Sequence, residues 1–371
     1  MLLAVFVPSF AHAAPAWADL PPMQADPQVL LDAAAEIGGE GPLEILFEDV
    51  RVVFREDRTV AREQHLVYLL RDPSAAQYWT RVDAGWSPWF QARPTMEARV
   101  IRPDGTTFAL DPSTIVEEAG RDVDATLLDD RRVAYAPLPQ VTAGSVVEVV
   151  ITERPTGAFG PGGASAREMV QTGEGAWPKR VTVEAPAKLP LRWSAVELDA
   201  TPVTTTKAGV RRLVFDVPAI LEAYERPEWT EPGLPAVPYL ALSTGTSWEA
   251  EAAAYHALVA DRLAGKTLRP LLAAAEGKAG IDRVEALLQA VRTRVRYTGV
   301  EFGESAIVPA APDEVLARGW GDCKEQAALL VALLAEGGIA ADVALIRPGA
   351  GEDVLPEHPT LAFFTHAIVH V

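Results

Sequence analysis

The stretch Gly319-Trp320-Gly321-Asp322-Cys323-Lys324-Glu325 runs directly into the apolar segment Gln326-Ala-Ala-Leu-Leu-Val-Ala-Leu-Leu-Ala335. It holds the only cysteine among 371 residues. Asp322 and Glu325 have the spacing of a helix capping box, and Gly337-Gly338 supplies a stop signal. The sequence therefore predicts a helix that begins at Cys323 and ends near Ala335.

The first-turn position of Cys323 bears on the reactivity of its thiol. The apolar residues that share a helical stripe with Cys323 are Ala327, Leu330, Val331 and Leu334. We therefore expect the thiol to point inward. The helix dipole and the unpaired first-turn amides favour a thiolate, and the same amides are placed to hold an oxyanion. The alternative is that Cys323 is a small buried hydrophobic residue, and helix position alone does not decide.

A base for this thiol is available near the end of the sequence. Residues 363–371 alternate like a strand and follow another strand-like segment at 339–346. One face of the last strand carries Phe364, His366, Ile368 and His370, and we expect this face to receive the Cys323 helix. The two histidines lie roughly 13 Å apart along a strand, so only one can serve the thiol. Spacing does not choose between them.

Five segments between residues 250 and 371 carry a resemblance to a known family: Val295-Arg-Tyr-Thr-Gly-Val-Glu-Phe-Gly-Glu304, Val308-Pro309, Gly321-Asp-Cys-Lys-Glu325, Gly338-Ile-Ala-Ala341 and Thr365-His-Ala-Ile-Val369. They are similar to bacterial transglutaminase-like proteins of the papain-like cysteine superfamily, in which Cys, His and Asp follow in this order. The resemblance implies that Cys323 is the nucleophile and His366 the base, and it assigns no role to His370. It places the third residue, an aspartate on the next strand, beyond Val371.

The resemblance implies a thiol enzyme that acts on peptide or protein amide bonds through an acyl-enzyme, as a protease, an amidase or an acyltransferase. The alternative is a non-catalytic envelope scaffold or peptide-binding module with a degenerate transglutaminase-like domain. Trp320 is the candidate substrate-binding residue, since it either walls the acyl groove beside the thiol or closes the core beneath its loop. We expect no cofactor. We also expect no metal, because His358, His366 and His370 share no ligand spacing with a second cysteine.

The earlier part of the sequence alternates with the period of strands, at residues 43–54, 60–70, 96–102, 133–135, 145–152, 180–184, 191–198 and 212–217. We expect an all-β, sandwich-like domain at 43–220, and we expect residues 41–220 to fold alone. Ile101-Arg-Pro-Asp-Gly105, Leu138-Pro139 and Gly144-Ser-Val-Val-Glu148 resemble the DUF3857-type β domain of unknown function that precedes transglutaminase-like domains in bacterial envelope proteins. These are turn and strand patterns, so they indicate a fold and not a chemistry.

The remaining segments complete an α+β architecture. Residues 15–42 are expected to form a linker with a short helix, and residues 221–247 a proline-rich connector. Helical periodicity at 248–264 and 281–296 then opens the transglutaminase-like α+β domain at 248–371, which the resemblance implies is incomplete at its C-terminus.

The N-terminal segment and the net charge indicate where the protein is located and which partners are disfavoured. Residues 1–14 form an apolar run with a small-residue cleavage site at Ala11-His12-Ala13, which predicts a signal peptide and a periplasmic or secreted protein. The net charge of −18 disfavours nucleic acid and anionic lipid as partners. No later apolar run reaches the roughly 18 residues that a membrane span needs, so we expect no span in the mature chain. The oligomeric state stays open.

Overall fold

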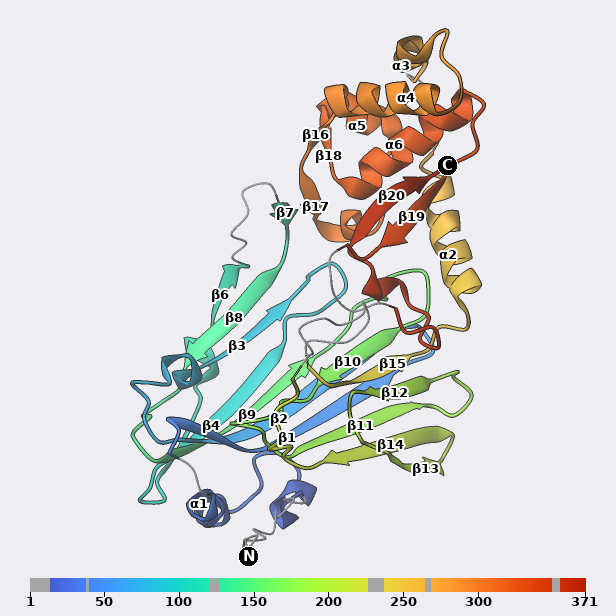
Figure 1. Cartoon of the computed structure of the whole chain (residues 1–371). Coiled ribbons are helices and arrows are strands. Elements are labelled where there is room, and N and C mark those ends of the chain that lie inside the picture. Colours follow the sequence, from blue (N-terminus) through green and yellow to red (C-terminus); the bar gives the residue numbers. More distant parts are fainter. Residues whose placement is uncertain (1–13, 38–39, 121–126, 226–236, 264–267, 349–353) are drawn as a thin grey trace, which may run out of the picture.

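Figure 1 shows two parts of the chain, one built of strands and the other mainly of helices. The computed structural model describes residues 14–37, 40–120, 127–225, 237–263, 268–348 and 354–371. The expected signal peptide, apart from Ala14, and residues 226–236 of the expected connector lie outside the described residues. We call the part up to residue 243 the β part and the part from Trp248 onward the helical part.

An eight-stranded sheet organises the β part, in the order β13-β14-β11-β1-β2-β9-β4-β5. Only the pair β1 and β11 runs parallel within it. In chain order its strands are β1 (Leu43–Phe54), β2 (Val60–Leu70), β4 (Thr95–Ile101), β5 (Thr107–Ala109), β9 (Ser145–Glu153), β11 (Lys179–Pro186), β13 (Val203–Lys207) and β14 (Val210–Val217).

Two three-stranded sheets cover one face of the large sheet. Val52 of β1 pairs with Arg62 of β2, six residues before Tyr68, so Val52 and Tyr68 point to the same face. Tyr68 belongs to a core beneath one small sheet, in the order β3 (Arg81–Trp86), β8 (Arg132–Pro137) and β6 (Val116–Ala119). Val52 belongs to a core beneath the other, in the order β10 (Ser165–Met169), β15 (Tyr239–Ser243) and β12 (Arg192–Val196).

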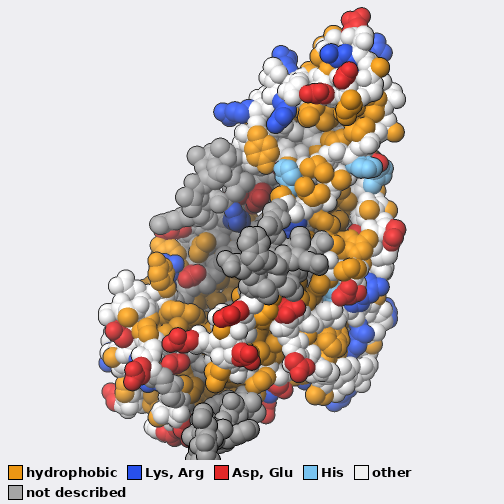
Figure 2. All heavy atoms as spheres, viewed as in Figure 1, with side chains coloured by type: hydrophobic (Ala, Val, Ile, Leu, Met, Phe, Trp, Pro, Cys, Tyr) orange, Lys and Arg blue, Asp and Glu red, His pale blue; other side chains and the backbone are white. Residues whose placement is uncertain are grey.

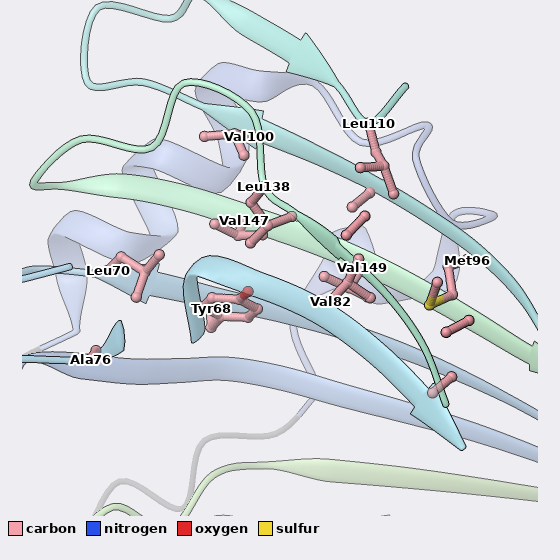
Figure 3. Close-up of a cluster of buried hydrophobic side chains, with 14 of the residues drawn as sticks. Tyr68, Leu70, Ala76, Val82, Met96, Val100, Leu110, Leu138, Val147 and Val149 are labelled. Carbon is pink, nitrogen blue, oxygen red and sulfur yellow. The ribbon is translucent and has the colours of Figure 1, made fainter. Parts of the chain in front are cut away.

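Figure 3 shows the first of these cores, where Tyr68, Val82 and Val147 lie together from three different strands. The opposite face of the large sheet packs against the N-terminal segment, which contains α1 (Pro27–Glu36). Phe47 of β1 and Val67 of β2 form a core there with Trp17 and with Leu30 of α1. The middle of the large sheet is therefore covered on both faces, which explains why its central strands have few exposed residues, whereas the outer strand β13 is exposed along its length.

Local sequence signals located most of these strands. The expected strands at 43–54 and 60–70 are confirmed residue for residue as β1 and β2. Residues 239–243, inside the expected connector, instead form β15, which pairs with both β10 and β12. The connector thus returns the chain to the β part before the helices begin.

The helical part surrounds one buried helix, α6 (Cys323–Glu336). Every residue from Ala327 to Leu334 is buried, as expected for a helix that packs on all sides. Its α-helical neighbours are α2 (Trp248–Ala260), α3 (Arg269–Leu272), α4 (Gly280–Arg294) and α5 (Pro312–Arg318). The strands β19 (Asp342–Ile346) and β20 (His366–His370) form an antiparallel pair that also packs against α6.

Short elements join the two parts. β7 (Leu127–Asp129) of the β part pairs in parallel with β17 (Gly299–Glu301), and the Gly303 amide donates to Asp130 Oδ2 at 3.1 Å. Within the helical part, a second parallel pair joins β16 (Arg296–Tyr297) to β18 (Trp320–Gly321). The 3₁₀ helices are η1 (Ala16–Asp19), η2 (Gln77–Thr80), η3 (Pro112–Thr114), η4 (Ala273–Ala275), η5 (Gly303–Ala306) and η6 (Leu361–Phe363).

The architecture is thus mixed α+β and richer in strand than in helix. Within the described ranges, no helix has the length and apolar character that crossing a bilayer requires. On the face shown in Figure 2, acidic side chains are scattered over the β part, in keeping with the formal net charge of −18.

Candidate functional site

The start of α6 is fixed by a complete capping box. Asp322 Oδ1 accepts from the Glu325 amide at 3.0 Å, and Glu325 Oε2 accepts from the Asp322 amide at 3.2 Å. Glu325 is fully buried and forms an ion pair with Arg318. A Cβ atom on Gly321 would lie 2.9 Å from Glu325 Oε2, so glycine leaves the space that this carboxylate occupies. The capping box predicted from the sequence is confirmed, and it holds Cys323 as the first residue of the helix.

The thiol of Cys323 is half-buried and lies against the beginning of β20, where it accepts a hydrogen bond from the Ala367 amide. Burial raises the pKa of the thiol above its ordinary value, and the negative charge of Asp322 raises it further. The Ala367 amide and the Lys324 ammonium oppose this rise without overcoming it. The helix position led to the opposite expectation, a lowered pKa, which is wrong for the resting protein because desolvation outweighs the amides.

Lys324 is buried next to the thiol. Its ammonium pairs with Asp322 Oδ2 and donates to the Val300 carbonyl at 2.9 Å. Burial raises the pKa of the Asp322 carboxyl, while the charge of Lys324 lowers it. The lysine therefore links three features: β17 through Val300, the helix cap through Asp322, and the thiol through its charge.

His366 is the first residue of β20 and is half-buried. β20 turns the buried Ala367 and the half-buried Val369 toward α6, whereas Ile368 is 41% exposed. The expectation that the face of His366, Ile368 and His370 receives the helix is wrong, because alternation defines two faces without saying which one is covered. Among the described residues, no hydrogen bond joins the His366 imidazole to Cys323. His366 is the residue before Ala367, whose amide contacts Cys323.

Tyr297 is a site residue that the sequence reasoning did not single out. The β16–β18 register places Tyr297 opposite Gly321, and the Thr298 amide donates to the Gly321 carbonyl at 3.1 Å. The Tyr297 hydroxyl hydrogen-bonds Cys323, and the pKa of the phenol is raised, first by burial and then by the charge of the thiolate. Its place in the Val295–Glu304 segment, which carries part of the family resemblance, is the sequence signal that points to it.

Trp320 lies in β18 and is half-buried. The guanidinium of Arg318 stacks over its ring at 4.0 Å from the centroid, and Arg318 Nε donates to the Trp320 carbonyl at 2.9 Å. These contacts hold the residue in place two positions before Asp322.

The other candidate ligands and bases are dispersed. His370 is exposed at the end of β20, and His358 is buried against Ser194 of β12, with 2.7 Å between Nε2 and Oγ. In the part of the chain that the structure describes, no three His, Cys, Asp or Glu side chains are arranged to hold a metal ion.

Comparison with known families identifies one domain. Residues 56–220 match the family described as a domain of unknown function with a solved structure, DUF3857. The β part therefore contains a DUF3857 domain, which begins within the β1–β2 turn and ends before the connector. No curated protein matches the chain.

Comparison with solved structures extends the likeness to the helical part. A "putative protease" from Parabacteroides distasonis superposes with a TM-score of 0.69 at 16% identity, over 89% of this chain and 65% of that chain. At this identity the likeness shows a shared fold, and this chain spans about two thirds of the other protein's length. The M1 zinc metallopeptidase from Deinococcus radiodurans matches with a TM-score of only 0.28 at 13% identity, over 57% of this chain and 45% of that chain, so that match carries no argument.

Proposed function

We propose that this chain, which carries a DUF3857 domain at residues 56–220, is a cell-envelope thiol enzyme acting on peptide or protein amide bonds. In this proposal the helical part is a transglutaminase-like, papain-like domain with Cys323 as nucleophile and His366 as base. One observation carries it: the only cysteine sits at the first position of the buried central helix, hydrogen-bonded to the amide of the residue that follows His366. The resemblance of residues 295–369 to transglutaminase-like proteins supports the same assignment.

In this proposal the reaction starts from a protonated thiol, since burial raises the pKa of Cys323. The nucleophile forms when the imidazole of His366 accepts the thiol proton. Catalytic hydrogen bonds are commonly long in unliganded enzymes and tighten in the substrate complex. The sulfur then attacks the amide carbonyl, and the first-turn amides of α6 receive the oxyanion.

Collapse of the tetrahedral intermediate completes acylation. The carbon–nitrogen bond breaks, and the departing amine takes the proton from the imidazolium of His366. A thioester on Cys323 remains, and attack by water yields hydrolysis, whereas attack by a second amine yields acyl transfer. In this scheme Trp320 walls the acyl groove, and the expected periplasmic or secreted location supplies peptide and protein substrates.

The test uses intact-protein mass spectrometry of the full chain incubated with a casein peptide digest. We expect an acyl adduct on Cys323 and release of shorter peptides or of ammonia, both lost in Cys323→Ala. His366→Ala should abolish the adduct, whereas the matched variant His370→Ala should retain it. Adduct formation that survives in His366→Ala would refute the assignment of the base.

The second candidate function is a non-catalytic envelope scaffold or peptide-binding module. It is favoured by the raised pKa of Cys323 together with the lack of a hydrogen bond from His366 to the thiol among the described residues. This alternative predicts that Cys323 behaves as an ordinary buried cysteine. Its alkylation by iodoacetamide would then show the same pH profile in the wild-type chain and in His366→Ala.

A further inference from the structure

Glu251 is a buried carboxylate that the proposed chemistry does not use. It lies in the first turn of α2 and is 3% exposed. Its Oε1 accepts a hydrogen bond from the Gly163 amide of the β part at 2.8 Å. Burial raises the pKa of this carboxyl, and the amides of Gly163 and Leu361 oppose that rise. Glu251 Oε2 is buried and has no hydrogen-bond partner among the described residues. A Cβ atom on Gly245 would lie 3.0 Å from Glu251 Oε1 and 2.1 Å from the Pro359 carbonyl oxygen, so the carboxylate lies beside the segment that leads to β20 as well as beside the backbone of the β part.

Three glycines allow this close approach. A Cβ atom on Gly162 would lie 1.8 Å from Glu251 Oε2, and one on Gly245 would lie 2.1 Å from the Pro359 carbonyl oxygen. A Cβ atom on Gly163 would lie 2.3 Å from the Gly245 nitrogen. A side chain at Gly163 or Gly245 would force two backbones apart, and one at Gly162 would displace the Glu251 carboxylate, so the junction depends on direct contact between Glu251 and main chain.

The segment from Pro356 to Leu361 is fastened to every strand of the adjoining small sheet. Ser243 Oγ of β15 donates to the Pro359 carbonyl at 2.6 Å. Thr360 Oγ1 donates to Ser165 Oγ of β10 at 2.9 Å, and His358 Nε2 lies 2.7 Å from Ser194 Oγ of β12. From the helical side, Trp248 Nε1 donates to the Pro356 carbonyl at 2.9 Å. The β part therefore holds the chain immediately ahead of the candidate base.

Leu361 carries this constraint to the site. It begins η6, and its side chain packs with Tyr255 of α2 and Ala328 of α6. Only Phe364 and Thr365 separate η6 (Leu361–Phe363) from the start of β20 at His366. The Thr365 amide donates to the Ile346 carbonyl at 3.1 Å. A shift of Leu361 would move the start of β20, and with it His366, relative to Cys323.

We propose that Glu251 is a positioning residue, which fixes the Pro356–Leu361 segment against the β part and so sets the position of His366 relative to the thiol. This inference rests on the proposed function, because it takes His366 as the base. The Gly163 amide, which donates a hydrogen bond to Glu251, lies within residues 56–220 of the DUF3857 domain. In this proposal the DUF3857 domain therefore helps to position the candidate base. Glu251 touches neither thiol nor substrate in this role.

The experiment measures the second-order rate constant for iodoacetamide alkylation of Cys323 in the full chain between about pH 5.5 and 9.5. Glu251→Ala should reduce the rate near neutral pH to the level of His366→Ala, and combining the two changes should add nothing further. Glu251→Gln keeps an oxygen acceptor for the Gly163 amide and should restore the wild-type profile. Glu249→Ala, two residues away on the exposed side of α2, is the matched control and should have no effect.

The outcomes separate this inference from the proposed function. A profile that is unchanged in His366→Ala counts against the proposed function itself. A profile that changes in His366→Ala but not in Glu251→Ala, with circular dichroism showing a folded chain, overturns the role of Glu251 alone. Should Glu251→Ala fail to fold, Gly162→Ala decides by the same readout, because its methyl group presses directly on the carboxylate. Wild-type labelling in Gly162→Ala would likewise overturn the proposal.

Discussion

At the scale of single residues, the environment of Cys323 departs most from what its helix position indicates. A helix N-terminus favours a thiolate, yet burial and the neighbouring Asp322 raise the thiol pKa. The sequence contained Asp322 and Lys324, but it could not show that both are buried and paired with each other. The sign of the pKa shift depends on that burial, so it could be obtained only from the folded chain.

The first prediction concerns Asp322→Asn. Asparagine is an equally good helix cap, but it removes the negative charge that raises the thiol pKa and leaves the Lys324 ammonium nearby. We expect the thiol pKa to fall and the iodoacetamide labelling rate at pH 7 to rise by roughly three- to tenfold, since one nearby charge shifts a pKa by about a unit.

Asp282→Asn is the control for this change, because Asp282 lies in the exposed first turn of α4. It should leave the labelling rate as in the wild type. A slower reaction in Asp322→Asn would show that the carboxylate acts on the thiol by some means other than its charge.

The second prediction concerns Tyr297→Phe. The hydroxyl donates to the sulfur when Cys323 is a thiolate, and hydrogen bonds to charged groups stabilise them by about 1.5–3 kcal/mol. The tyrosine is 54% exposed, so we expect the lower end of that range and a labelling rate at pH 7 that falls by roughly tenfold. Tyr78→Phe, at a side chain that is 82% exposed in the β part, should change nothing. An unaltered rate in Tyr297→Phe would remove this residue from the site.

At the scale of elements, sequence patterns succeeded where the determining signal is local. The start of α6 follows from the capping box of Asp322 and Glu325, and the bounds of β1 and β2 follow from alternation interrupted by a turn. β15 was missed because all five of its residues are buried and lack alternation, and because prolines precede it. The covered face of β20 was misassigned because only packing against α6 distinguishes its two faces.

The third prediction concerns the cap of α6. Arg318→Ala would leave the fully buried Glu325 carboxylate without its cation. Removing one partner of a buried ion pair costs about 3–5 kcal/mol, and because Arg318 is 26% exposed we expect about 2–3 kcal/mol. Chemical denaturation measures this loss, with the exposed Arg292→Ala of α4 as control. Adding Glu325→Gln to Arg318→Ala should recover part of it, and a further loss of stability instead would contradict the ion-pair argument.

At the scale of the whole molecule, the β part and the helical part are interlocked. After β14 the chain stays bonded to the β part at Ile220 and Tyr224, and beyond the connector it forms β15 in the same part before α2 begins. β7 pairs with β17, and the Pro356–Leu361 segment lies on the small sheet that contains β15. The two-part organisation was visible in the change of sequence periodicity, whereas these connections join residues more than a hundred positions apart and left no local signal.

The last prediction tests where the β part ends. β10 and β12 each pair only with β15 in their sheet, and Leu240 and Leu242 of β15 are buried in the same core as Val52. Burying a leucine stabilises a fold by about 1.5–3 kcal/mol, so losing both removes on the order of 5 kcal/mol, comparable to the whole stability of many domains. The fragment 41–220, which the sequence alone indicated as an independent unit, should therefore unfold without a cooperative transition. The fragment 41–247 should show a β-type circular dichroism spectrum and a cooperative melt. Equal melting of the two fragments would mean that β15 contributes little, and that the smaller sheet is held by the large sheet alone.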